Sequence, residues 1–178
     1  MTTAYYLALP DAGSIDPVQL QAIAASDWFQ GLGRVISSAE PEMIETARSL
    51  AGVNGVEAEI RPPMRDVDRS ASGALIPAEF DVVTDVFFAV PDESVCGWER
   101  AIDAQARIAV CFAAALNAPT TGNLLLVGKS TIGALLLAHL LGQPISRSLH
   151  QSGGGVLFAF DITERTLRHG SQLLEAIA

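Results

Sequence analysis

The chain has 178 residues and a formal net charge of −9; 49% of its residues are hydrophobic and 17% are charged. This length predicts one domain, residues 1–178, with a sizeable core, and the high apolar fraction favours an element buried on both faces or an interface in a homo-oligomer. Nucleic-acid binding rests on clustered lysine and arginine, and the sequence has no basic run or stripe, so a nucleic-acid partner is excluded.

The first third of the chain alternates strand-like and helix-like segments. Residues 4–9 form a short apolar run stopped by a proline, which predicts a buried strand. Asp16 and Pro17 are typical of a helix start, here at residues 17–25. Further strands are predicted at 33–38 and 56–60, with a helix at 41–51 between them, followed by a long polar loop at 61–75.

The rest of the chain continues the alternation. Helices are predicted at residues 77–88, 97–118, 130–141 and 170–178, and strands at 123–127 and 155–162. Strands that alternate with helices predict an α/β fold, in which a mainly parallel sheet is covered by helices on both faces as three layers. Ligands of such sheets bind beyond the carboxyl ends of the strands.

The stretch L-L-L-V-G-K-S-T, which starts at residue 124, raises the question of a phosphate-binding loop. A Walker A loop would need glycine at position 123, where Asn123 stands, and its interior would be an apolar run better suited to a core strand. We therefore reject this loop. What remains is a helix that starts at Ser130, beside Lys129, at the end of a strand, an arrangement that can attract an anion.

No segment predicts a membrane span or a secretion signal. Residues 124–141, the most apolar stretch, contain Lys129, Ser130, Thr131 and His139, and so predict a strand and a helix. The N-terminus M-T-T-A-Y-Y lacks the basic region of a signal peptide. We expect a cytoplasmic protein without membrane contacts.

Cysteines and histidines form no metal or redox motif. Cys96 and Cys111 are predicted on one helix, roughly 22 Å apart, too far for a disulfide; we expect reduced, mostly buried thiols. The histidines are scattered, so neither a metal nor another cofactor is predicted. We expect His139 to pack within its helix, His169 to lie on the surface, and His150 to occupy a loop that could approach a pocket.

The order and spacing of several short motifs resemble a known family. The motifs are Tyr5–Leu9, Ser37–Ser38, Thr46–Ala47, Glu93–Ser94, and the strand and helix around G-K-S-T-I-G-A-L-L. Over nearly the whole chain they resemble the histidine phosphatase superfamily, the phosphoglycerate mutase-like proteins. Residues 97–108 and 153–161 look like a bacterial subgroup. The resemblance implies the α/β fold of that superfamily.

The first catalytic motif of the family has changed in this chain. The family ends its first strand in Arg-His-Gly, where this chain has Ala8, Leu9 and Pro10, followed by Asp11. In the family, that histidine attacks phosphorus and carries the phosphoryl group. A nucleophile needs a lone pair, which Leu9 lacks, so the resemblance implies that the phosphohistidine step is lost.

The other positions of the family pocket have changed as well. Glu42 falls where the family has an arginine, Lys129 (followed by Ser130) replaces the second histidine, and Asp66 stands where the family usually has glutamate. Two unit charges 4 Å apart interact by about 4 kcal/mol at an effective dielectric of 20. Glutamate in place of arginine therefore opposes phosphate binding by several kcal/mol. We hypothesise that Lys129 pairs with Glu42 or Asp66 and neutralises the pocket from within.

These substitutions predict a catalytically degenerate member, acting as a non-catalytic binding module for a small anion or a protein partner. One alternative is an enzyme, such as a phosphoester hydrolase, that uses rearranged residues, namely Asp66, Lys129 and His150. Arg65 and Arg69, near Asp66 in sequence, could restore positive charge. Another alternative is a mainly structural oligomer.

Overall fold

The computed structural model describes residues 2–10, 17–150 and 155–173, and the strands within them form one six-stranded sheet. The strands are β1 (Thr3–Leu9), β2 (Leu32–Ser37), β3 (Ala58–Ile60), β4 (Asn123–Lys129), β5 (Val156–Asp161) and β6 (Thr166–Leu173). Their order across the sheet is β3-β2-β4-β1-β5-β6. The first four strands are parallel, β5 runs antiparallel to β1, and β6 runs antiparallel to β5. The predicted α/β class is confirmed, with a mixed sheet.

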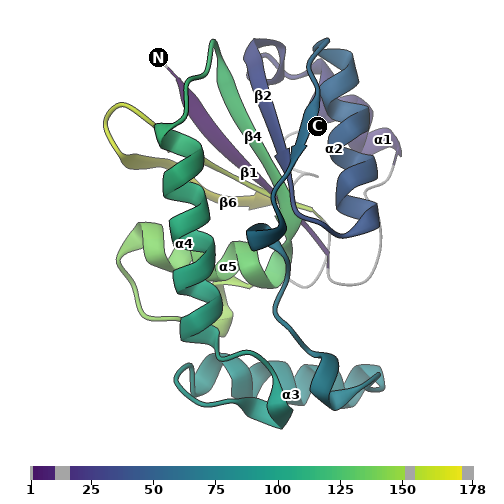
Figure 1. Ribbon diagram of the computed structural model, residues 1–178, viewed down its shortest axis with the longest axis vertical. Helices are drawn as coiled ribbons and strands as arrows, with labels where there is room; N and C mark the ends of the chain where they lie inside the picture. The colour runs from purple at the N-terminus through teal and green to yellow at the C-terminus, as the bar shows by residue number, and fades with distance from the viewer. Residues whose placement is uncertain (1, 11–16, 151–154, 174–178) are drawn as a thin grey trace.

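Helices cover both faces of the sheet, as predicted. They are α1 (Pro17–Ala25), α2 (Pro41–Val53), α3 (Pro77–Ala89), α4 (Ala101–Asn117) and α5 (Ser130–Leu141). Figure 1 shows α4 and α5 away from α1 and α2, with α3 beyond one end of the sheet. The first three helices begin at proline, whose fixed φ suits the first helical position. Within the described parts of the chain, no helix has the length and apolarity to cross a membrane.

Side chains of β1 alternate between two hydrophobic cores, because successive residues of a strand point to opposite faces. Tyr6 and Ala8 join the core beneath α4 and α5, whereas Leu7 and Leu9 join the core beneath α1 and α2. Each of these four residues is at most 4% exposed. This two-sided burial explains the short, continuous apolar run that the sequence shows at this strand.

The junction between β4 and α5 packs directly on Tyr6. The Tyr6 ring is fully buried and stacks on Phe158, with ring centroids 5.1 Å apart. A Cβ atom at Gly128 would collide with the Tyr6 hydroxyl, and one at Gly133 would lie 2.8 Å from the ring and 3.2 Å from Ala8 Cβ. The two glycines therefore let the strand and helix approach this ring.

The helix predicted at residues 97–118 begins later, at Ala101. Cys96 and Gly97 have φ values of 52° and 76°, and this left-handed backbone ends a short 3-10 turn before the helix starts. The prediction that both cysteines share one helix is therefore wrong. Both thiols are free, but Cys96 is exposed and Cys111 is half-buried, so the expectation of mostly buried thiols is also wrong.

The closing helix predicted at residues 170–178 is wrong where the structure describes it, because β6 continues to Leu173; residues 174–178 lie outside the described residues. A tight hairpin turn after Asp161 joins β5 to β6. Asp161 Oδ1 accepts hydrogen bonds from the backbone N–H groups of Thr163 and Glu164, both at 2.9 Å, and its Oδ2 pairs with Arg168 at 2.6 Å. An aspartate that caps a turn in this way can indicate a hairpin in a sequence, but the helix-like pattern of residues 170–178 led to the wrong prediction.

His139 is also placed differently from the prediction. It lies in the last turn of α5, just before Gly142, which ends the helix in the left-handed conformation. The side chain is exposed rather than packed in the core. A histidine near a helix C-terminus is favourable because its charged form complements the helix dipole.

We predict that Gly128→Ala lowers the free energy of unfolding by about 1–3 kcal/mol, because the added methyl group meets the rigid, buried Tyr6 ring. Tyr6→Phe in the same background should recover part of the loss by removing the colliding oxygen. Urea denaturation followed by tryptophan fluorescence measures both effects. Equal stability of Gly128→Ala and the native protein would contradict the packing described here.

Candidate functional site

The carboxyl ends of β1 and β4 lie side by side, and their last residues are in register. Leu9 pairs with Lys129, and Ala8 pairs with Gly128, across the parallel ladder. Leu9 is fully buried in the core beneath α1 and α2. The structure therefore brings together the two positions that the sequence resemblance matched to the family histidines. Neither residue offers an imidazole.

Lys129 pairs with Glu42. Its Nζ lies 2.6 Å from Glu42 Oε1, and the lysine side chain is only 8% exposed. Glu42 occupies the first turn of α2, and Lys129 is the residue before the first turn of α5. The hydrogen bond from Lys129 lowers the pKa of Glu42. Of the two partners that we hypothesised for Lys129, this contact identifies Glu42.

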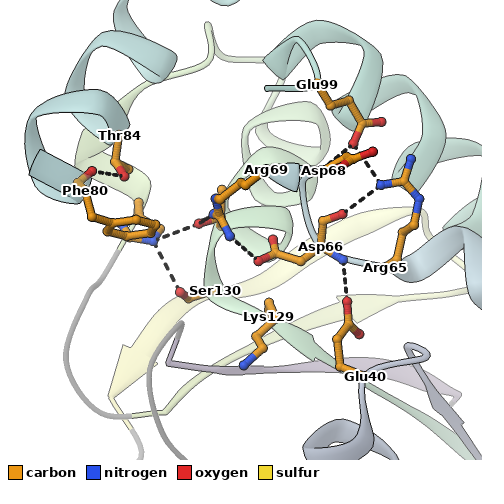
Figure 2. A network of polar contacts seen from close by, with 12 residues as sticks. Glu40, Arg65, Asp66, Asp68, Arg69, Phe80, Thr84, Glu99, Lys129 and Ser130 are labelled. Atoms are coloured by element: carbon orange, nitrogen blue, oxygen red, sulfur yellow. Dashed lines mark hydrogen bonds and ion pairs between the residues drawn. The ribbon is translucent and has the colours of Figure 1, made fainter. Parts of the chain in front are cut away.

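Asp66 lies near the same edge and contacts Arg69. Asp66 Oδ2 accepts a hydrogen bond from Arg69 Nη1 at 2.6 Å, and Arg69 Nη2 donates to Thr131 Oγ1 at 3.0 Å. The backbone N–H of Asp66 donates to Glu40 Oε1 at 2.7 Å. Figure 2 shows Asp66 between Glu40 and Arg69 above the strand ends. Three carboxylates (Glu40, Glu42 and Asp66) thus accompany the two cations Lys129 and Arg69.

Aromatic rings hold Arg69 in place. Its guanidinium carbon lies 5.2 Å from the centre of the Phe80 ring and 5.0 Å from that of Trp98, within the range of cation–π attraction. Phe80 belongs to α3, and Trp98 follows the short 3-10 turn at Val95–Gly97. Arg69 therefore links the loop before α3 to the start of α5.

Arg65 makes different contacts. Its Nη1 donates to the Asp66 carbonyl at 3.2 Å and to Glu99 Oε2 at 3.3 Å. Arg107 also binds Glu99, at 2.8 Å, and donates to the carbonyl oxygens of Pro63 and Arg65. Burial acts to raise the pKa of Glu99, but hydrogen bonds from Arg107 and the Asp68 backbone outweigh it, and the pKa is lowered. This cluster fixes the segment that carries Asp66.

His150 approaches the start of α5, as the sequence allowed. It follows the 3-10 turn Arg147–Leu149 and is 8% exposed. Its Nε2 lies 3.2 Å from Ser130 Oγ and 3.3 Å from Thr131 Oγ1. The ring also packs near Phe88 of α3, with centroids 5.5 Å apart. The structure therefore gathers Lys129, Ser130 and His150 at one strand-to-helix junction.

The remaining predicted pocket positions differ in what they contribute. Ala8 lines a cavity of about 10 Å³ beside Ser130. Pro10 is half-buried after the end of β1, and Asp11 lies outside the described residues, as does the side chain of His169. Among the described residues, no group of three or more His, Cys, Asp or Glu side chains could hold a metal ion.

Sequence reasoning missed Glu40 and Thr131. Glu40 directly precedes α2, and Thr131 lies in the first turn of α5, so both stand beside residues that the resemblance had singled out. Their positions in the sequence could have identified them, because polar side chains at the starts of helices that follow parallel strands gather at one edge of the sheet.

Solved structures with a similar fold are phosphatases and related proteins. Phosphoserine phosphatase from Entamoeba histolytica, in complex with 3-phosphoglyceric acid, gives a TM-score of 0.70 at 13% identity, covering 97% of this chain and 98% of that one. YhfR from Bacillus stearothermophilus gives 0.68 at 14% identity over 97% and 96%. A mycobacterial glucosyl-3-phosphoglycerate phosphatase, complexed with VO3, gives 0.67 at 16% identity over 88% and 91%.

These structures define a phosphatase-type α/β fold, and a sequence comparison identifies the family. The family model described as histidine phosphatase superfamily (branch 1) matches residues 19–164. The chain therefore belongs to the histidine phosphatase superfamily, and the resemblance seen in the sequence is confirmed. A comparison with curated proteins found no match.

We predict that Glu42→Gln lowers the free energy of unfolding at neutral pH by about 1–2 kcal/mol, because the buried Lys129 loses its carboxylate. The Glu42 side chain is 39% exposed, and solvent screening keeps the loss below that of a fully buried pair. The pair lowers the pKa of Glu42, so the stability difference is complete above the ordinary value of 4.5 and disappears as pH falls through the lowered pKa.

Urea denaturation at several pH values measures this difference. Glu45→Gln, an exposed glutamate on the same helix, is the matched control. Equal losses in both variants, or a loss that persists in acid, would show that the pair with Lys129 does not stabilise the fold.

Proposed function

We propose that this protein is a pseudo-phosphatase: a member of the histidine phosphatase superfamily that has lost phosphoryl transfer and acts as a binding or partner module. It would work in the cytoplasm as a single domain, residues 1–178. The observation that carries the proposal is the pairing of Leu9 with Lys129 at the strand ends, where Lys129 is bound to Glu42 at 2.6 Å.

The first support for the proposal is the residue at the position of the family's nucleophilic histidine. Leu9 has no lone pair and is fully buried in the hydrophobic core, so it cannot attack phosphorus. A buried leucine at this position also stabilises the fold, because its burial contributes about 1.5–3 kcal/mol. The position has therefore changed from a chemical role to a packing role.

The second support is the balance of charged side chains at this edge of the sheet. Phosphate is bound in proteins by several cationic donors at once. Here Lys129 contacts Glu42 and Arg69 contacts Asp66, both at 2.6 Å, and Glu40 adds a further carboxylate at this edge. A dianion would have to compete with these carboxylates, which the Coulomb energy of unit charges at such distances opposes by several kcal/mol.

Ligand binding after the loss of a histidine has a precedent among the similar structures. A histidine-to-alanine mutant of the Entamoeba phosphoserine phosphatase, in complex with phosphoserine, resembles this chain with a TM-score of 0.61 at 18% identity. That protein holds a ligand although a histidine has been removed. By analogy, the fold can keep a recognition role after its chemistry is lost.

We expect no hydrolysis of a generic aryl phosphate above the buffer blank, from acidic to neutral pH, because Leu9, at the position of the family's nucleophilic histidine, has no lone pair. The native protein and Lys129→Ala should give the same blank-level rate, with an active histidine phosphatase assayed alongside. Turnover that survives purification and falls in Lys129→Ala would overturn the proposal.

A second experiment tests whether Glu42 is what excludes anions. Inorganic phosphate should leave the melting temperature of the native protein unchanged and should raise that of Glu42→Gln as its concentration increases, because the variant removes the Glu42 carboxylate from the Lys129 ammonium. Glu45→Gln should behave as the native protein does. Phosphate-dependent stabilisation of the native protein would show that the pocket still binds anions as it stands.

Two alternatives keep specific support. An enzyme with a rearranged site is favoured by the contact of His150 with Ser130 and Thr131. A self-associating protein is favoured by exposed apolar side chains on α4, where Ile102 is 45% and Val110 is 72% exposed. A monomeric mass in solution would exclude the second alternative.

A further inference from the structure

The loss of phosphohistidine chemistry leaves one arrangement unexplained. Ser130 Oγ lies 3.2 Å from Nε2 of His150, and both residues are buried, at 4% and 8% exposed. A hydroxyl within hydrogen-bond reach of an imidazole nitrogen is the arrangement in which serine is activated as a nucleophile. A structural hydrogen bond would not require the pair to stand at the carboxyl edge of the sheet, where substrates bind.

We propose that Ser130 and His150 form a nucleophile–base pair that hydrolyses short-chain carboxylic esters of acetyl size. This inference goes beyond the pseudo-phosphatase proposal and is independent of it, because it concerns carbon rather than phosphorus chemistry. It makes the strand-to-helix junction an acyl-transfer site.

The backbone at Ser130 suits this role. β4 ends at Lys129 and α5 begins at Ser130, so the serine stands directly on a strand-to-helix turn. The local sequence G-K-S-T-I-G carries glycine two residues before the serine and again three residues after it. Many serine hydrolases also place their nucleophile between a strand and a helix, on a strained turn with the pattern G-x-S-x-G; Ser130 shares this position but has neither that glycine spacing nor a positive φ. The N-terminus of a twelve-residue helix favours the negative charge that develops on the ester oxygen.

Thr131 connects Arg69 to the base. Arg69 can only donate hydrogen bonds, so Thr131 Oγ1 accepts from it at 3.0 Å. The same oxygen lies 3.3 Å from His150 Nε2. To act as the base, His150 must keep Nε2 unprotonated, and the single lone pair of this nitrogen then accepts the proton of Ser130. Arg69 and Thr131 are therefore positioning residues for the base.

A small apolar cavity beside the serine indicates the size of the acyl group. Its volume is about 10 Å³, and it is lined by Ser130, Ala8, Gly133, Ala134, Leu149 and Phe158. A cavity of this size holds about one water molecule or one methyl group. The acyl chain that fits is therefore acetyl, and longer chains would clash with the wall.

The reaction balances with water as the only co-reactant. Ser130 Oγ transfers its proton to His150 Nε2 and forms a bond to the carbonyl carbon; the ester C–O bond breaks, and the alkoxide takes the proton from His150. Water then attacks the acyl-enzyme and gives its proton to His150, and the Oγ–C bond breaks. The carboxylic acid leaves, and Ser130 recovers its proton.

Two measurements on the full chain test the site. The first is hydrolysis of p-nitrophenyl acetate and p-nitrophenyl butyrate by the native protein, Ser130→Ala, His150→Gln and Ser148→Ala. Ser148 is an exposed serine in the 3-10 turn before His150 and serves as the matched control. We expect acetate to be preferred, rates to fall about a hundredfold in the first two variants, and Ser148→Ala to match the native protein.

The second measurement is covalent labelling of the native protein with methanesulfonyl fluoride, read by mass spectrometry of the digested chain. This measurement needs no substitution at Ser130, so it tests whether Ser130 is a nucleophile even if Ser130→Ala fails to fold. A label on Ser130 that is lost in His150→Gln supports the proposal. No label, a label on another residue, or an acetate rate that is the same in Ser130→Ala overturns it, whatever the outcome of the phosphatase assay.

Discussion

The contact between Lys129 Nζ and Glu42 Oε1 organises the carboxyl edge of the sheet. Two helices, α2 and α5, begin at this edge, and their N-termini concentrate partial positive charge there, beside the lysine ammonium. Such an edge attracts an anion. In this chain the anion is supplied from within, by a carboxylate in the first turn of α2. In the proposed function, the ion pair stands where a substrate phosphate would otherwise bind.

A second ionic cluster holds the loop over that edge. Glu99 accepts hydrogen bonds from Arg65, Arg107 and the backbone of Asp68, and Arg107 also binds carbonyl oxygens of the loop. Asp66 and Arg69 project from this loop toward the start of α5. The segment that follows the third parallel strand is therefore fixed by polar contacts within the chain.

The sequence predicted elements where local signals were strong. Proline at the first helical position located α1 and α2, and the apolar run from residue 124 located β4 and α5. The spacing of the family motifs predicted a pairing of Lys129 with Glu42 or Asp66, and the structure shows the contact with Glu42. The turns at Cys96 and Asp161 were missed, because a left-handed residue and a capping carboxylate decide them against the helical periodicity around them. Arg69 was placed only as a neighbour of Asp66, since its partners Thr131 and Trp98 are distant in sequence.

The packing of Tyr6 against Gly128 also limits what position 128 can hold. A Cβ atom there would meet the Tyr6 hydroxyl. Tyr6 is itself fixed by Phe158 on the neighbouring strand. A larger residue at Gly128 therefore requires a compensating change at Tyr6, so the effect of a substitution at this strand end depends on the core behind it.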